Sequence, residues 1–140
     1  MRFAKEAESD GGRLQVEATL GYTLTDSRDS RNQVRVQGIP RHRGTASVTV
    51  RPVERWEGRI EWRAESDMLD YGPADFAPAP RPGYSRLDGS TRYRLYSKEV
   101  GIREVSIKGR VGNLLNRRYE ERRGYPAPGI NFLLGAELSI

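Results

Sequence analysis

The sequence contains no cysteine and one histidine, His42. Without cysteine the chain forms neither a disulfide framework nor a thiolate metal site, and one histidine builds neither a histidine-based metal site nor a hydrolase triad unaided. The adjacent carboxylates Glu120 and Glu121 point to different sides of an extended chain, so they do not form an acid–base pair. We therefore expect a protein that is not an enzyme, with no cofactor and no metal.

Long apolar runs are also lacking. Hydrophobic residues make up 36% of the chain, charged residues make up 31%, and the mean hydropathy is −0.75. No run approaches the roughly 20 apolar residues of a membrane-spanning helix. A membrane β-barrel is not excluded, because its lipid-facing and lumen-facing residues alternate and cancel in the average. The N-terminal sequence MRFAKEAESD has no apolar segment, so we expect this chain to carry no signal peptide of its own.

A strict alternation of apolar and polar residues takes the place of such runs. Between Arg13 and Leu24, and again from Ile130 onward, every second residue is apolar. Because side chains on a strand alternate between faces, each segment predicts a strand with one apolar face. The first is longer than a usual globular strand and is close to the length that crosses a bilayer at a tilt. Similar patterns predict six long antiparallel strands, at about residues 13–24, 45–52, 59–68, 84–96, 104–115 and 130–140.

The second face of the predicted strand 59–68 is charged, with mixed signs. Such a face suits a water-filled lumen crossed by ion pairs, and unpaired charge would be costly inside a soluble sandwich. The connections between the six strands alternate long, short, long, short and long, which matches the extracellular loops and periplasmic turns of outer-membrane barrels. Aromatic residues near the strand ends fit interfacial girdles. The residues of the charged face are Arg59, Glu61, Arg63, Glu65 and Asp67.

Six strands are fewer than the eight of the smallest bacterial outer-membrane barrels. The segments Arg2–Ala7 and Gln33–Gly38 are short and poorly patterned, so we do not count them as strands and treat residues 1–12 as an N-terminal lead-in. We therefore predict an all-β fold in which residues 13–140 form an antiparallel transmembrane β-barrel segment of about six long strands. An open sheet with an apolar face would not be stable alone, so this segment belongs to a larger barrel.

The end of the sequence carries a motif, VGNLLNRRYEERRGYPAPGINFLLGAEL. It contains an Asn-Leu-Leu element (Asn113–Leu115), a basic pair followed by Tyr (Arg117–Tyr119), a Gly-Tyr-Pro-x-Pro-Gly loop (Gly124–Gly129), and a final strand that opens at Phe132. This run resembles the C-terminal signature of TonB-dependent outer-membrane receptors, which transport iron chelates, cobalamin and similar scarce nutrients. The segments that look like the preceding strands of that family are YTLTDSRD, Gly38–His42 and Gly83–Leu95.

The resemblance implies that residues 13–140 are the last six strands of a barrel of roughly 22 strands in the bacterial outer membrane. We expect the plug domain, the segment that contacts TonB and the signal sequence to be absent from this chain, which would then not be transport-competent alone. TonB would act only through that plug region. The implied partners are outer-membrane lipid, lipopolysaccharide and the barrel-assembly machinery, which would read the last strand at Phe132, Leu134, Leu138 and Ile140. Two positions depart from the family pattern, since Ile130 replaces a usual basic residue and Ile140 replaces a usual terminal aromatic.

The long connections hold the candidate ligand-binding residues. Cationic and aromatic groups suit an anionic iron chelate such as a siderophore complex. The same groups also suit lipopolysaccharide phosphates, or simply keep the loops soluble, and the sequence leaves these possibilities open. The candidates are Arg28, Arg31, Arg35, Arg41 and His42 in the first loop, Tyr71 and Phe76 in the second, and Arg117, Arg118, Arg122 and Arg123 in the third.

Two other classes of protein are weighed against a receptor barrel. The net charge of +5 would suit a nucleic-acid partner, but the arginines alternate with acids along strands and form no basic stripe, so we expect no nucleic acid. A small soluble or eight-stranded β-barrel that binds a ligand in its lumen is the alternative function, because the alternation also permits an apolar interior. Strand length, the rhythm of the connections and the terminal motif favour the receptor.

Overall fold

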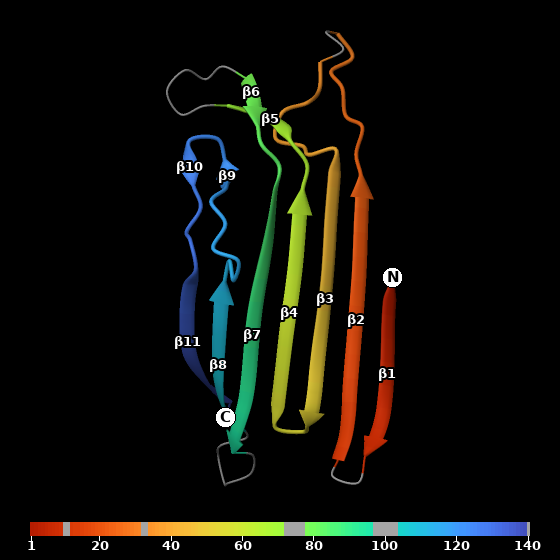
Figure 1. Cartoon of the computed structure of the whole chain (residues 1–140), viewed down its shortest axis with the longest axis vertical. Coiled ribbons are helices and arrows are strands. Elements are labelled where there is room, and N and C mark those ends of the chain that lie inside the picture. The colour runs from red at the N-terminus through yellow and green to blue at the C-terminus, as the bar shows by residue number, and fades with distance from the viewer. Residues whose placement is uncertain (10–11, 32–33, 72–77, 97–103, 140) are drawn as a thin grey trace.

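The computed structural model describes residues 1–140 except 10–11, 32–33, 72–77, 97–103 and 140 (Figure 1). Seven strands form one antiparallel sheet in the order β1-β2-β3-β4-β7-β8-β11. They are β1 (Arg2–Ser9), β2 (Gly12–Leu24), β3 (His42–Val53), β4 (Trp56–Glu65), β7 (Tyr84–Tyr96), β8 (Glu104–Gly112) and β11 (Asn131–Ser139). Two short hairpins stand apart from it: β5 (Met68–Tyr71) with β6 (Pro78–Arg81), and β9 (Glu120–Arg122) with β10 (Tyr125–Pro126).

The described residues contain no helix that is both long enough and apolar enough to cross a membrane.

The register aligns the apolar residues of neighbouring strands. Since side chains alternate with a period of two, a shift of one residue would move a whole strand's apolar set to the other face. The observed pairing keeps these sets together from β2 to β11, so one face of the sheet is apolar and the other polar. One register row across the apolar face runs Ala18, Val48, Ile60, Gly89, Val111 and Phe132.

The apolar face is exposed in this chain. Ile60 is 54% exposed, Phe132 is 74% exposed and Leu134 is 80% exposed. Among the residues whose side chains the structure describes, Met68 alone is a buried hydrophobic residue. The sheet therefore has no apolar core of its own, and its apolar face needs cover from its surroundings.

Both edges of the large sheet are open. Among the described residues, strand β1 pairs only with β2 and strand β11 pairs only with β8, and Figure 1 places the two at opposite edges. Each neighbouring pair of strands in this sheet runs in opposite directions. From β1 to β11 the direction reverses six times, an even number, so β1 and β11 run in the same direction. An antiparallel closure therefore needs an odd number of further strands between them.

The long connections and the short β3–β4 turn lie at opposite ends of the sheet. The three long connections, together with both hairpins, gather at one end in Figure 1, and the β3–β4 turn lies at the other, where β11 also ends. This is the arrangement that the rhythm of connections predicts. In the large sheet, the six predicted strands are present and the all-β prediction is confirmed.

Three details of the strand prediction are wrong. Residues Arg2–Ser9 form a seventh strand, so most of the presumed lead-in belongs to the sheet. The strand predicted at about residues 59–68 ends at Glu65, and Met68 begins the β5–β6 hairpin, which is separate from the large sheet. Strand β8 ends at Gly112 and not at Leu115, because Asn113 takes a left-handed backbone conformation with φ of 52°.

Candidate functional site

The first two long connections are bonded to each other above the sheet. The backbone N–H of Gly38 donates to the carbonyl oxygen of Leu69 at 2.8 Å. Beside it, the guanidinium of Arg35 lies 3.3 Å from the carboxylate of Asp67. One bond uses the backbone and the other uses charged side chains, so the first connection is held against the base of β5.

Arg81 joins the second connection to the third. Its side chain is fully buried, and its guanidinium donates to the carbonyl oxygen of Glu120 at 2.9 Å. The same group lies 3.4 Å from the carboxylate of Glu65 and 5.3 Å from the ring centre of Tyr84. A buried cation is costly unless it is paired, so these contacts fix where β6 and β9 meet.

Asp70 makes a second link between the same two connections. This buried carboxylate accepts a hydrogen bond from the backbone N–H of Tyr71 at 2.9 Å and another from that of Arg123 at 2.8 Å. Because a charged acceptor strengthens a hydrogen bond, the bond from Arg123 pins the β9–β10 hairpin to β5.

Tyr119 anchors the third connection to β7. Its ring stacks on that of Tyr84, with ring centres 4.4 Å apart. Its hydroxyl accepts a hydrogen bond from Arg86 at 3.1 Å, and Arg86 also lies 2.9 Å from the carboxylate of Glu121. Together with Arg81 and Asp70, these contacts make one bonded layer of the three long connections, which we call the loop layer.

The Asn-Leu-Leu element has a structural role at the base of the loop layer. Asn113 is almost fully buried, and its amide nitrogen donates to the carbonyl oxygens of Arg117 at 2.8 Å and Pro128 at 3.1 Å. Its side-chain oxygen accepts the N–H of Arg117 at 3.0 Å, and its own N–H donates to Asp88 at 2.9 Å. Asn116 also has a positive φ, 47°, which asparagine tolerates better than most residues.

A hollow of about 580 Å³ opens between the first connection and β5. Its volume lies in the range of small-molecule sites, and its wall combines acidic, basic, amide and phenol groups with two valines. Such a wall can bind a polar ligand through hydrogen bonds and one aromatic contact. The residues around it are Asp29, Val34, Arg35, Val36, Gln37, Gly38, Asp70 and Tyr71.

The polar face of the sheet carries ion pairs that cross from strand to strand. Arg43 on β3 lies 3.0 Å from Glu65 on β4. On β11, the carboxylate of Glu137 lies 2.7 Å from Lys108 on β8 and 3.1 Å from Arg92 on β7. Charges on this face therefore find partners within the sheet, as a wet wall requires.

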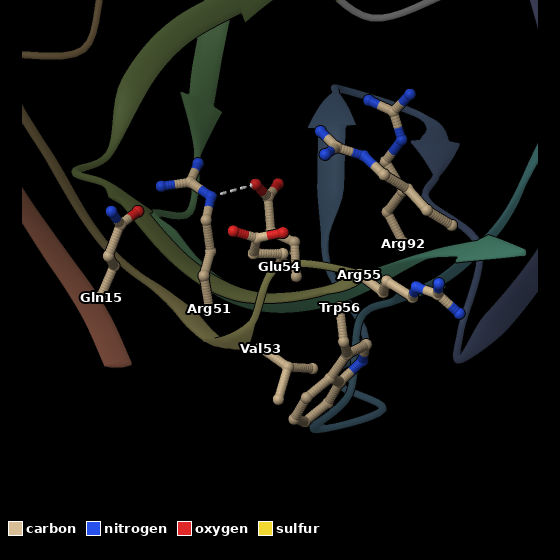
Figure 2. Close-up of a pocket in the computed structure, with 9 residues that line it drawn as sticks. Gln15, Arg51, Val53, Glu54, Arg55, Trp56 and Arg92 are labelled. Carbon is tan, nitrogen blue, oxygen red and sulfur yellow. Dashed lines mark hydrogen bonds and ion pairs between the residues drawn. The ribbon is translucent and has the colours of Figure 1, made fainter. Parts of the chain in front are cut away.

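A second hollow of about 380 Å³ lies on the polar face at the short-turn end (Figure 2). Arg51 lies 2.6 Å from Glu57, and Figure 2 places Glu54 beside this pair and Arg92 across the hollow. Val53 projects from the opposite side of the ribbon in Figure 2. No motif in the sequence points to this hollow.

Comparison with known protein families gives a match over more than half of the chain. The family described as TonB dependent receptor-like, beta-barrel matches residues 6–114. The chain belongs to this family. Members of the TonB-dependent receptor family are receptors and transporters and not enzymes, and membership favours a receptor barrel over the small soluble barrel. The match spans β2 to β8, upstream of most of the terminal motif.

In this receptor barrel, the structure brings some of the predicted ligand residues together. Tyr71 lines the hollow of the loop layer, and Arg123 is tied to its neighbour Asp70. Arg122 lies exposed on β9 next to them. Arg35, a candidate ligand-binding residue of the first loop, lines the same hollow.

Other predicted ligand residues lie apart from that hollow. Arg117 and Arg118 are exposed beside the Asn113 turn. His42 is the first residue of β3 and not a loop residue, and its ring nitrogen lies 2.8 Å from the hydroxyl of Tyr22. Since His42 is in register with Leu24, this pair sits on the apolar face. Arg41 is exposed just before it, and Phe76 lies outside the described residues.

The predicted assembly residues lie together on β11. Phe132, Leu134 and Leu138 pair with Val111, Gly109 and Val105 of β8, so all three are on the apolar face. Ile140 lies outside the described residues. Recognition by the barrel-assembly machinery stays a prediction.

Sequence reasoning missed the residues that hold the loop layer together. Arg81 and Asp70 bond to backbone groups 39 and 53 residues further along the chain, so no local pattern reports the contact. A signal was present for Arg81, since an arginine between Pro80 and Pro82 has little backbone freedom.

Proposed function

We propose that this chain forms part of the wall, and part of the ligand-binding loops, of an outer-membrane receptor for a scarce nutrient such as siderophore-bound iron or cobalamin. The observation that carries the proposal is the division of the sheet between an exposed apolar face and a polar face whose charges pair with one another. A sheet that separates lipid from a water-filled lumen requires this division.

Strands from beyond the described sheet would complete the barrel. The edges at β1 and β11 are unpaired, and exposed edges invite further pairing. Because an odd number of strands is needed, a second copy of the same sheet cannot close it with every pair antiparallel and both loop layers on one side. Energised uptake would then belong to the closed barrel with its plug and TonB, and not to this sheet alone.

The loop layer would lie outside the cell and meet the ligand. Long loops are extracellular in such barrels, and the short-turn end is periplasmic. We propose that Tyr71, Arg35, Arg122 and Arg123 contact an anionic chelate, with the phenol giving an aromatic contact and the guanidinium groups giving charge. Exposed Arg41, Arg117 and Arg118, and the Tyr22–His42 pair, would meet lipopolysaccharide.

Single-cysteine labelling tests this orientation, since the chain has no cysteine of its own. In cells that express the receptor carrying this chain, Arg118→Cys should react with a membrane-impermeant maleimide. The matched control Glu54→Cys, in the short turn, should react only after the outer membrane is opened. Equal reaction of the two variants in intact cells would refute the proposed orientation.

A further inference from the structure

The hollow of the loop layer carries more negative than positive charge. Two carboxylates, those of Asp29 and Asp70, belong to its wall, and Arg35 is the one cation that lines it among the described residues. The guanidinium of Arg35 lies 3.3 Å from the carboxylate of Asp67 and also donates to the backbone carbonyl oxygen of that residue at 3.4 Å. Because the charge of Arg35 is already balanced, the hollow favours a positive group over a negative one.

Asp70 is the carboxylate that most needs such a group. The residue is 8% exposed, and its two carboxylate oxygens accept the backbone N–H groups of Tyr71 at 2.9 Å and Arg123 at 2.8 Å. These N–H groups carry no net charge, and no described side chain forms an ion pair with Asp70. Residues 32–33 and 72–77, which adjoin the wall in sequence, contain no lysine, arginine or histidine. A buried carboxylate is costly unless an opposite charge compensates it.

The rest of the wall suits a primary ammonium group on a carbon chain. Tyr71 is 44% exposed, and the face of its ring attracts a cation. Val34 and Val36, which are 51% and 37% exposed, offer apolar contact to carbon atoms, and the amide oxygen of Gln37 can accept a hydrogen bond. A volume of about 580 Å³ admits such a chain together with part of the molecule that carries it.

A metal ion fits this wall less well than an ammonium group. Calcium and magnesium ions take about six oxygen ligands. Within the part of the chain that the structure describes, no three histidine, cysteine, aspartate or glutamate side chains gather closely enough to hold a metal ion. A primary ammonium group has three N–H donors, which two carboxylates and one amide oxygen can accept.

We propose that this hollow binds a primary ammonium group of the transported ligand, which Asp70 and Asp29 hold by charge and Tyr71 holds by the face of its ring. The proposal rests on the proposed function, because it takes the hollow as part of the ligand site. The anionic chelate would then lie against Arg122 and Arg123 outside the hollow, so the ligand would carry charges of both signs.

Charge-selective labelling tests the hollow directly. Gln37→Cys places a thiol on its wall, in a chain with no cysteine of its own. In the receptor carrying this chain, reconstituted in lipid vesicles, reaction rates are measured with aminoethyl methanethiosulfonate, which carries a primary ammonium group, and with its neutral hydroxyethyl analogue. The ratio of the two rates should be about threefold higher than for free cysteine in solution, because an unpaired carboxylate attracts the cation.

Asp70→Asn should lower this ratio toward that of free cysteine. The rate with the neutral reagent should stay the same, since it reports whether the hollow keeps its shape. Asp26→Asn is the matched control, because Asp26 lies 3.4 Å from Arg28 in the same connection but does not line the hollow, and it should leave the ratio unchanged. Should Asp70→Asn alter the neutral rate, Arg35→Gln decides, because removal of the cation that lines the hollow should raise the ratio.

The outcomes separate the two proposals. A ratio at Gln37→Cys equal to that of free cysteine, or a raised ratio that neither Asp70→Asn nor Arg35→Gln changes, would overturn the ammonium site and leave the receptor wall intact. Reaction of Arg118→Cys with the impermeant maleimide only after the outer membrane is opened would overturn the proposed function instead, because the loop layer would then not lie outside the cell.

Discussion

The two faces of the sheet are built from the same strands, but their side chains differ in whether they find partners within the chain. On the polar face, Glu61 lies 3.1 Å from Arg59 and 3.0 Å from Arg63, so charges are paired within the chain. On the apolar face, Leu134 and Phe132 are largely exposed and have no cover. The polar face therefore needs only water and its neighbours, whereas the apolar face depends on an environment that the chain does not supply.

Two adjacent leucines give the strongest test of this difference. Leu133 and Leu134 are 69% and 80% exposed, but they lie on opposite faces of β11. Leu134→Arg should oppose insertion into a bilayer by about 2–4 kcal/mol if the residue lies near the midplane. Leu133→Arg should cost less than about 1 kcal/mol, because its charge enters the wet face. Reversible denaturant titration in vesicles measures both, and equal destabilisation would contradict the assignment of faces.

Asn113 supports the loop layer and belongs to neither face. Asn113→Ala removes three side-chain hydrogen bonds to the backbone groups of Arg117 and Pro128, which should cost about 1–3 kcal/mol. The loss should be local, so limited proteolysis between β8 and β11 should speed up while the large sheet persists. Asn113→Gly keeps the positive φ but not the bonds, and the same sensitivity in both variants would assign the effect to the bonds.

Single ion pairs of the polar face should matter least. Glu61→Gln removes a carboxylate shared by two exposed arginines, and such pairs are worth about 0–1 kcal/mol each and weaken with salt. The denaturation midpoint of Glu61→Gln should therefore lie slightly below that of the unmodified chain at low salt. At high salt the two midpoints should be the same. A loss as large as that of Leu134→Arg would contradict the view that the charged face is held by many small contributions.

The sequence predicted the faces well because their signal is local. The alternation in residues 13–24 and 130–138 fixes which residues share a face, and the observed register keeps them together. Strand β1 escaped prediction because Lys5 interrupts its apolar positions and is in register with Val16. Its identity as a strand depends on pairing with β2 more than on its own pattern.

The loop layer was less predictable for a different reason. Its ligand-facing candidates were chosen for charge and aromatic character, and Tyr71 and Arg123 do lie near each other. His42 was assigned to a loop, although its hydrogen bond to Tyr22 places it on the apolar face. Contacts between distant connections, such as that of Arg81 with Glu120, decide the layer, and one sequence does not report them.

A cysteine scan along β11 tests the central claim most directly. Each position from Phe132 to Leu138 is changed singly to cysteine in the receptor, reconstituted in lipid vesicles, and exposed to a water-soluble maleimide. The account predicts reaction at 133, 135 and 137, which face the polar side, and protection at 132, 134, 136 and 138. Uniform reaction along the strand, or the opposite alternation, would contradict the assignment of one face to lipid and the other to a wet lumen.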